Sequence, residues 1–228
     1  MWLHFEDAAF VAVIGDMVAS RAIGERAEVQ RRLERALQEV NEVYAADIAS
    51  RFMITLGDEF QGLLRAGAQT PELIERIERA MYPVRVRFGL GVGAITTEID
   101  AEKPLGADGP AYYGARHAIE ALKASERKRM EPRATARIEI TGYPDVAEVV
   151  NTLFALNTAL KSRWAQRQRE VIAAYIECGG TQSEVAQRLG IHQSNVQKAL
   201  AHASFYTYQK ALRALSQLLS GVGGPGDV

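Results

Sequence analysis

The strongest constraint on the fold is a segment near the C-terminus with the spacing of two short helices joined by a tight turn. Thr181 is followed three residues later by Glu184, a pair that can close a helix N-terminus by reciprocal hydrogen bonds. Ala186, Gly190 and Val196 then follow with the spacing Ala-x3-Gly-x5-Val. The small residue lets two helices approach, and the glycine frees the turn between them. This spacing is typical of a helix-turn-helix.

The helix predicted after this turn starts near His192 and carries a polar face. Glutamine and asparagine side chains can bond bidentately to adenine in the major groove, and lysine and arginine contact phosphates. The alternative is a three-helix packing unit with a polar surface helix that binds nothing. The residues predicted to bind double-stranded DNA are Gln193, Ser194, Asn195, Gln197, Lys198 and Arg188.

Charge is distributed unevenly along the 228 residues. Residues 1–150 carry 19 basic and 24 acidic side chains, whereas residues 151–228 carry 8 basic and 4 acidic side chains. An acidic part joined to a basic part indicates two modules, with nucleic acid as a candidate partner of the second. The predicted organisation is an α/β domain (1–142), a linking helix (143–164), an all-α helix-turn-helix domain (165–220) and a disordered tail (221–228).

Composition excludes several classes of protein. The single cysteine, Cys178, rules out a disulfide framework or a cysteine metal cluster within the chain. No apolar stretch approaches the roughly 20 residues that a membrane span needs. The first seven residues lack the basic region and apolar run of a signal peptide. We therefore expect a cytoplasmic protein without a membrane partner.

The N-terminal part alternates strand and helix patterns. The order of these patterns predicts an α+β fold, a ferredoxin-like α/β sandwich with a mostly antiparallel sheet. Strands are predicted at residues 8–14, 51–56, 60–64, 84–97 and 135–140, and helices at 25–48, from 70 onward, at 108–123 and at 145–163. Within the fourth strand, glycine at alternate positions (Gly89, Gly91, Gly93) indicates close approach by another backbone or by a ligand.

Two carboxylates stand beside glycine at predicted strand ends, Asp16 after Gly15 and Asp58 after Gly57. If the first strand and the hairpin are neighbours in one sheet, the two side chains can converge. Carboxylates that close repel unless a cation lies between them, and hard oxygen ligands select Mg²⁺ or Mn²⁺. The alternative is that each aspartate is a turn residue with local hydrogen bonds.

The stretch from Val11 to Lys123 resembles the catalytic domain of class III nucleotidyl cyclases and, more distantly, that of GGDEF-type diguanylate cyclases. The resemblance implies that Asp16 and Asp58, together with Glu59, hold Mg²⁺ or Mn²⁺, and that Arg116 stabilises charge on a transferring phosphate. Tyr112 stands where the cyclases have an asparagine, and Ile54 where they have an adenine-reading lysine. The residues predicted to bind a nucleotide are Ser20, Arg21 and Tyr112.

Over residues 8–219 the chain also resembles the SatD family of bacterial proteins. The matching stretches are Ile14–Asp16 with Ser20 and Arg21, Thr55–Leu64, Arg87–Gly89, Gly106–Tyr113 with Ala115 and Arg116, and the C-terminal helix-turn-helix. This resemblance implies a bacterial cytoplasmic protein and no particular biochemical activity.

Taken together, the patterns predict a DNA-binding transcriptional regulator whose cyclase-like domain dimerises and senses a nucleotide with Mg²⁺. A homodimer is expected because two half-sites multiply the discrimination that one helix-turn-helix provides. The alternative is a metal-dependent nucleotidyl cyclase or related nucleotidyl transferase acting on an NTP through Asp16, Asp58 and Arg116. A third reading is a protein-interaction module in which both halves are scaffolds.

Overall fold

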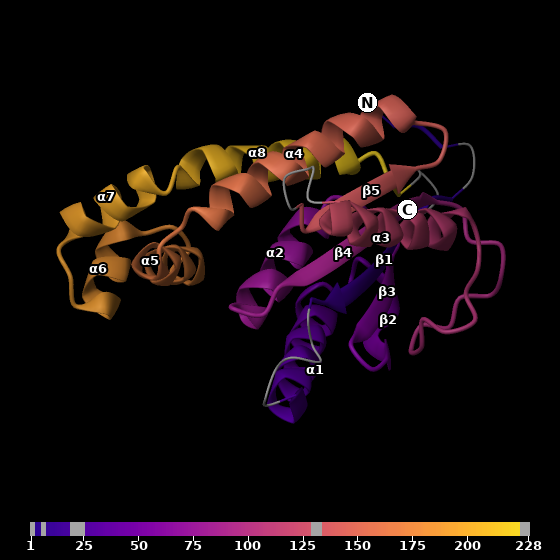
Figure 1. Ribbon diagram of the computed structural model, residues 1–228, viewed down its shortest axis with the longest axis horizontal. Helices are drawn as coiled ribbons and strands as arrows, with labels where there is room; N and C mark the ends of the chain where they lie inside the picture. Colours follow the sequence, from indigo (N-terminus) through magenta and orange to yellow (C-terminus); the bar gives the residue numbers. More distant parts are fainter. Residues whose placement is uncertain (1–2, 6–7, 19–25, 129–133, 224–228) are drawn as a thin grey trace.

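The computed structural model describes residues 3–5, 8–18, 26–128 and 134–223, which form a mixed α/β structure (Figure 1). The strands are β1 (Phe10–Met17), β2 (Ile48–Leu56), β3 (Glu59–Leu64), β4 (Val86–Gly93) and β5 (Ala136–Ile140). The helices are α1 (Arg26–Val43), α2 (Thr70–Met81), α3 (Pro110–Lys128), α4 (Pro144–Ser162), α5 (Gln166–Glu177), α6 (Gln182–Leu189), α7 (Gln193–His202) and α8 (Phe205–Leu219). None of these helices combines the length and apolar content that a bilayer crossing requires.

The five strands form one sheet in the order β2-β3-β1-β4-β5. β1 pairs antiparallel with both β3 and β4, and β2 pairs antiparallel with β3, but β4 and β5 run parallel. The sheet is therefore mixed, and the prediction of a mostly antiparallel sheet is wrong. The cause is α3, because a helix that crosses between two neighbouring strands returns the chain to the same end of the sheet.

Successive side chains of β1 point to opposite faces of the sheet, and both faces are covered by apolar residues. Val11 and Val13 face the larger cluster, to which α1, α2, α4 and the end of α8 contribute. Ala12 and Ile14 face a smaller cluster that includes Ala111, Ala115 and Ile119 of α3. The helix α3 thus lies on the face that also carries Asp16.

Glycines of β4 let α3 lie directly on the sheet. A Cβ atom added at Gly91 would lie 1.9 Å from the carbonyl oxygen of Ala111, and one added at Gly89 would lie 2.2 Å from that of Ala115. Real side chains do not approach this closely, so only glycine fits. Of the two explanations for the alternating glycines, the structure shows close approach by a backbone.

The C-terminal helices have a core of their own around Trp164, Val185, Val196 and Phe205. Helix α8 belongs to both cores, because its first half packs here and its Leu215 and Leu219 pack beneath the sheet. Figure 1 shows α4 and α8 running side by side from the sheet to the distant α6 and α7. A self-contained all-α domain over residues 165–220 is therefore not observed, because the end of α8 completes the α/β core.

Two local expectations also differ from the structure. The tail was expected to be unable to pack from residue 221, but Val222 is buried and its carbonyl oxygen accepts a hydrogen bond from the Gly67 N–H (3.2 Å). Residues 224–228 lie outside the described residues. Thr181 precedes α6 as expected, yet its exposed hydroxyl makes no capping hydrogen bond. Water can solvate an exposed helix terminus in place of such a cap.

Candidate functional site

The predicted carboxylates lie where β1 ends and β3 begins. Asp16 lies opposite Glu59 of β3 on one side and Arg87 of β4 on the other. The Asp58 carbonyl accepts a hydrogen bond from the Met17 N–H (3.2 Å), so the hairpin turn abuts the end of β1. The structure therefore brings Asp16, Asp58 and Glu59 to one edge region of the sheet.

Asp16 is almost fully enclosed, with 7% of its surface exposed, and it is held by two cations. Arg87 binds it through both nitrogens of one edge of the guanidinium, Nε to Oδ1 (2.8 Å) and Nη2 to Oδ2 (2.9 Å). The Lys123 ammonium of α3 lies 3.0 Å from Oδ2. Both oxygens of the carboxylate are thereby engaged with positive charge.

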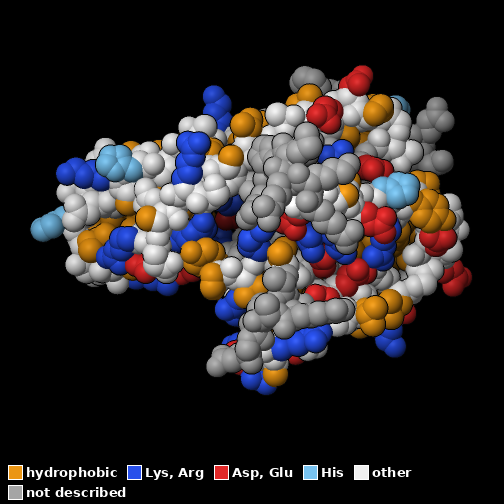
Figure 2. Space-filling model, viewed as in Figure 1, with side chains coloured by type: hydrophobic (Ala, Val, Ile, Leu, Met, Phe, Trp, Pro, Cys, Tyr) orange, Lys and Arg blue, Asp and Glu red, His pale blue; other side chains and the backbone are white. Residues whose placement is uncertain are grey.

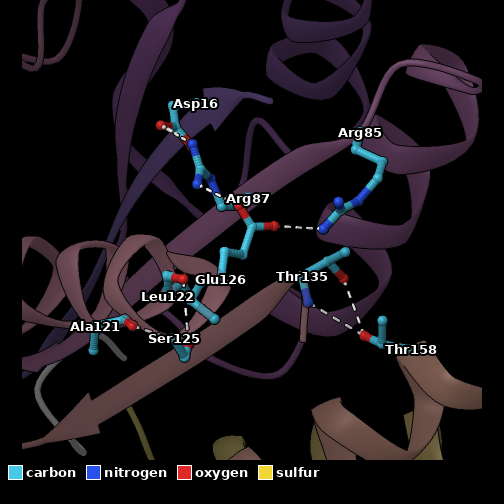
Figure 3. Close-up of polar contacts among 9 residues, drawn as sticks. All are labelled: Asp16, Arg85, Arg87, Ala121, Leu122, Ser125, Glu126, Thr135 and Thr158. Carbon is cyan, nitrogen blue, oxygen red and sulfur yellow. Dashed lines mark hydrogen bonds and ion pairs between the residues drawn. The ribbon is translucent and has the colours of Figure 1, made fainter. Parts of the chain in front are cut away.

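The same arginine continues a chain of ion pairs between β4 and α3 (Figure 3). Arg87 Nη1 lies 2.8 Å from Glu126 Oε2, and Arg85 Nη2 lies 2.6 Å from Glu126 Oε1. The attraction between neighbouring opposite charges offsets part of the free energy needed to remove each charge from water. This network ties the ends of β1 and β4 to α3.

These residues do not fit a resident Mg²⁺ or Mn²⁺. A divalent cation needs free carboxylate oxygens, but those of Asp16 face Arg87 and Lys123, and Glu59 pairs with Arg116 (2.9 Å). In the described part of the chain, no group of three histidine, cysteine, aspartate or glutamate side chains is placed to hold a metal.

The other residues that the cyclase resemblance singled out are placed as follows. Arg116 extends from α3 and is 44% exposed beside Glu59. Tyr112 is buried in the cluster under α3; its hydroxyl has no hydrogen-bond partner among the described residues, and burial raises its pKa to about 12. A phenol enclosed by the core is not presented to a ligand. Ser20 and Arg21 lie outside the described residues.

Replacing Asp16 with asparagine is expected to lower the free energy of unfolding by about 2 kcal/mol at neutral pH. The substitution leaves Arg87 and Lys123 without the carboxylate that balances them, although Arg87 keeps Glu126 and Lys123 is partly exposed. Urea denaturation measures the loss. Asp145→Asn, in the exposed first turn of α4, is the matched control and is expected to cost about 0.3–1 kcal/mol. An Asp16→Asn protein as stable as this control would contradict the network.

The predicted turn between α6 and α7 is formed by backbone hydrogen bonds. Gly190 adopts a left-handed conformation (φ 63°), and its N–H bonds to the Gln187 carbonyl (3.3 Å). The Ile191 N–H bonds to the Ala186 carbonyl (3.0 Å). This paired pattern ends a helix at a glycine and turns the chain sharply. A Cβ at Gly190 would meet nothing within 4 Å, so the backbone angle is what requires glycine.

Helix α7 presents its polar residues outward while Val196 and Leu200 are fully buried. The lobe formed by α5, α6 and α7, at the left of Figure 2, shows basic and histidine side chains with little acidic surface. Arg188 is exposed on α6 and pairs with Glu177 (2.5 Å). The exposed positions on α7 are Gln193, Ser194, Asn195, Gln197, Lys198, Ala201 and His202.

Sequence reasoning missed the cations that neutralise Asp16. A signal was present, because Arg85 and Arg87 alternate with Val84 and Val86 at the start of a buried strand. Period-two alternation places both arginines on one face of the sheet, where a buried charge needs a partner. The sequence gives no indication that this partner is Asp16.

The solved structures similar to this chain include an enzyme and a regulator of gene expression. One is a bacterial light-regulated adenylyl cyclase, with 14% identity, a TM-score of 0.38, and coverage of 57% of this chain and 75% of that chain. The other is a regulator of polyketide synthase expression from Bifidobacterium adolescentis, with 13% identity, a TM-score of 0.27, and coverage of 93% and 86%. No curated protein matches the chain. The model of the SatD family matches residues 10–219, and the chain therefore belongs to the SatD family.

Proposed function

We propose that this protein binds double-stranded DNA through α7 and acts as a transcriptional regulator. The observation that carries the proposal is the outward face of α7. It combines amide, hydroxyl and ammonium groups on a helix at the far end of the molecule from the sheet (Figure 1). A helix of ten residues is about 15 Å long, which suits insertion into a major groove.

The way α7 is held supports the same proposal. Its inner face is fixed by Val196 and Leu200, and the turn at Gly190 sets its angle to α6. A side chain on a rigid, packed helix reads base edges better than one on a loop. Arg188 lies on the preceding helix, where it can contact phosphates and fix the register of α7 on the duplex.

Two copies of the chain on one duplex are part of this proposal. A single α7 offers few side chains to base edges. Two half-sites about one helical turn apart increase the discrimination between DNA sequences. Enrichment of tight-binding duplexes from a random pool tests this, because a dimer selects sequences with two-fold symmetry. Selected sequences that carry only one half-site would oppose the dimer.

Duplex binding is expected to weaken as salt rises and to depend on Lys198. Fluorescence anisotropy of labelled duplexes should give a negative slope of log affinity against log salt. Lys198→Ala removes one phosphate contact from each copy and should reduce the magnitude of that slope by about 0.9 for every copy bound to the duplex. Lys103→Ala, an equally exposed lysine in the α/β part, is the matched control and should leave the slope unchanged.

Substitutions test this proposal better than truncation does. Deleting residues 165–219 removes Leu215 and Leu219 from the core beneath the sheet, so a truncated chain that fails to bind gives no information about α7. The full-length double variant Gln193→Ala/Asn195→Ala is expected to lose about 10-fold or more in affinity for an enriched duplex. Wild-type affinity in this variant would remove α7 from the interface.

A further inference from the structure

We propose that a cleft between the α/β part and the C-terminal helices binds a small organic anion with a flat apolar body. The cavity has a volume of about 510 Å³, within the range of sites for small molecules and cofactors. It lies between the end of α2, the segment that leads into β4, and the corner from α4 to α5 (Figure 1). In the space-filling view, the molecule is hollowed between the left lobe and the body that carries α2 (Figure 2).

Both parts of the protein contribute apolar and aromatic lining. Trp164 is held in place because its indole N–H donates to the Ala203 carbonyl (2.8 Å). Aromatic and aliphatic side chains on both walls suit a flat apolar body. The apolar and aromatic lining residues are Tyr82, Pro83 and Val84 from one part and Trp164, Ile172 and Ala173 from the other.

The charge of the ligand follows from Arg169. Its guanidinium carbon lies 4.4 Å from the centre of the Tyr82 ring and 5.7 Å from that of the Trp164 ring. Nη2 donates to the Lys161 carbonyl, but Nε is buried and has no hydrogen-bond partner among the described residues. A buried donor without an acceptor costs free energy that a ligand oxygen would recover.

The lining of the cleft carries four basic and three acidic side chains, an excess of one positive charge. The Lys161 ammonium is paired with Glu75 and Glu78, Glu170 with Arg167, and Arg85 with Glu126. Within the described part of the chain, neither Arg79 nor Arg169 forms an ion pair with a carboxylate, although both line the cleft. Two guanidinium groups without carboxylate partners favour an anionic ligand.

The position of the cleft gives the ligand a regulatory effect, and this part of the inference rests on the proposed duplex binding. Arg169 is on α5 and Trp164 lies just before that helix, in the part that carries α7, whereas Tyr82 follows α2. A molecule that contacts both sides binds one relative arrangement of the two parts more tightly than others and so shifts the population toward it. Duplex affinity then depends on whether the cleft is filled.

Titration of the full-length Trp2→Phe protein with naphthalene-1-sulfonate tests the cleft, because Trp164 is then the only tryptophan. We expect saturable quenching of Trp164 with one site per chain by calorimetry, and about 10-fold weaker binding of the uncharged 1-naphthalenemethanol. Arg169→Gln should weaken sulfonate binding about 10- to 100-fold. Arg213→Gln, an exposed arginine of α8 outside the cleft, is the matched control and should bind as the parent does.

A second variant tests the cleft independently, in case Arg169→Gln does not fold. Ala173→Phe fills the cleft without removing any charge and should abolish quenching, with circular dichroism confirming that the helices remain. Absence of saturable binding to the parent protein overturns the inference. So does binding that neither Arg169→Gln nor Ala173→Phe weakens.

The regulatory part has its own readout. A saturating concentration of naphthalene-1-sulfonate is expected to change duplex affinity by about fivefold or more in the parent and not in Ala173→Phe. Unchanged affinity in the parent overturns regulation while leaving the site in place. A parent protein that binds the sulfonate but no duplex contradicts the proposed function and not the site.

Discussion

Replacing Lys161 with methionine is expected to lower the free energy of unfolding by about 3–5 kcal/mol, the largest effect of any single substitution considered for this chain. Lys161 Nζ lies 3.2 Å from Glu75 Oε2 and also contacts Glu78. The side chains of these glutamates are only 11% and 14% exposed. Without the ammonium, two neighbouring carboxylates remain largely shielded from water with no cation between them.

The cluster around Lys161 joins three helices. Lys161 is on α4 and the two glutamates are on α2. The hydroxyl of Tyr208, on α8, donates a hydrogen bond to Glu75. Burial opposes the charge on Lys161, but Glu75 and Glu78 outweigh it and raise the pKa of the ammonium above its usual value. Burial together with Glu75 also raises the pKa of the Tyr208 phenol. At neutral pH Lys161 is therefore charged and the Tyr208 hydroxyl keeps its proton.

Urea denaturation of the full-length protein measures the effect of Lys161→Met. Lys210→Met, at an exposed position of α8, is the matched control and should change the free energy of unfolding by less than about 0.5 kcal/mol. Adding Glu75→Gln and Glu78→Gln to Lys161→Met should recover part of the loss, because the uncompensated charges are then gone. A loss below about 1 kcal/mol for Lys161→Met would contradict the cluster.

Replacing Gly91 with alanine is expected to cost about 3 kcal/mol of stability, at the upper end for overpacking a core. The new methyl group would lie 1.9 Å from the Ala111 carbonyl oxygen and 2.3 Å from the Ala115 nitrogen. Both are backbone atoms of α3, so no side chain can rotate away. The helix must lift from the sheet, and its contacts with β1 and β4 loosen.

Gly114→Ala is the matched control for this substitution. Gly114 is on α3 itself, and a Cβ there would lie 3.3 Å from its nearest neighbours, Gly91 Cα and Glu139 Cβ. Alanine also favours helix over glycine by about 1 kcal/mol, which offsets this tight contact. Thermal unfolding followed by circular dichroism should show a large fall in Tm for Gly91→Ala and little change for Gly114→Ala. Equal changes would contradict the close packing of α3 on β4.

Much of the fold could be predicted from local patterns. The apolar run that became β1, the alternating glycines of β4 and the turn glycine at position 190 each reflect a requirement that one segment imposes on its own backbone. The parallel pairing of β5 with β4 was missed, because strand direction depends on how a connection crosses the sheet. Local sequence patterns do not show how the connection between two strands crosses the sheet.

The contacts of the candidate site are only partly predictable from local sequence patterns. Asp16 and Asp58 were expected at neighbouring strand ends, and the antiparallel pairing of β1 with β3 places them there. The charge environment of Asp16 was not predictable, because Arg87 is 71 residues away in sequence and reaches it only through the pairing of β1 with β4. The partner of α8 was not predictable for the same reason, since the pattern of Leu215 and Leu219 predicts an apolar face but not what that face packs against.

Crosslinking from α7 to DNA tests the central claim most directly. A photoreactive group is attached to Ser194→Cys in a Cys178→Ser background, with Ser220→Cys at the exposed end of α8 as the control. If α7 enters the groove, position 194 crosslinks to bases of a bound duplex and position 220 does not. Equal crosslinking from both positions, or none from position 194 under conditions where the duplex is bound, would contradict the assignment of α7 as the DNA-reading helix.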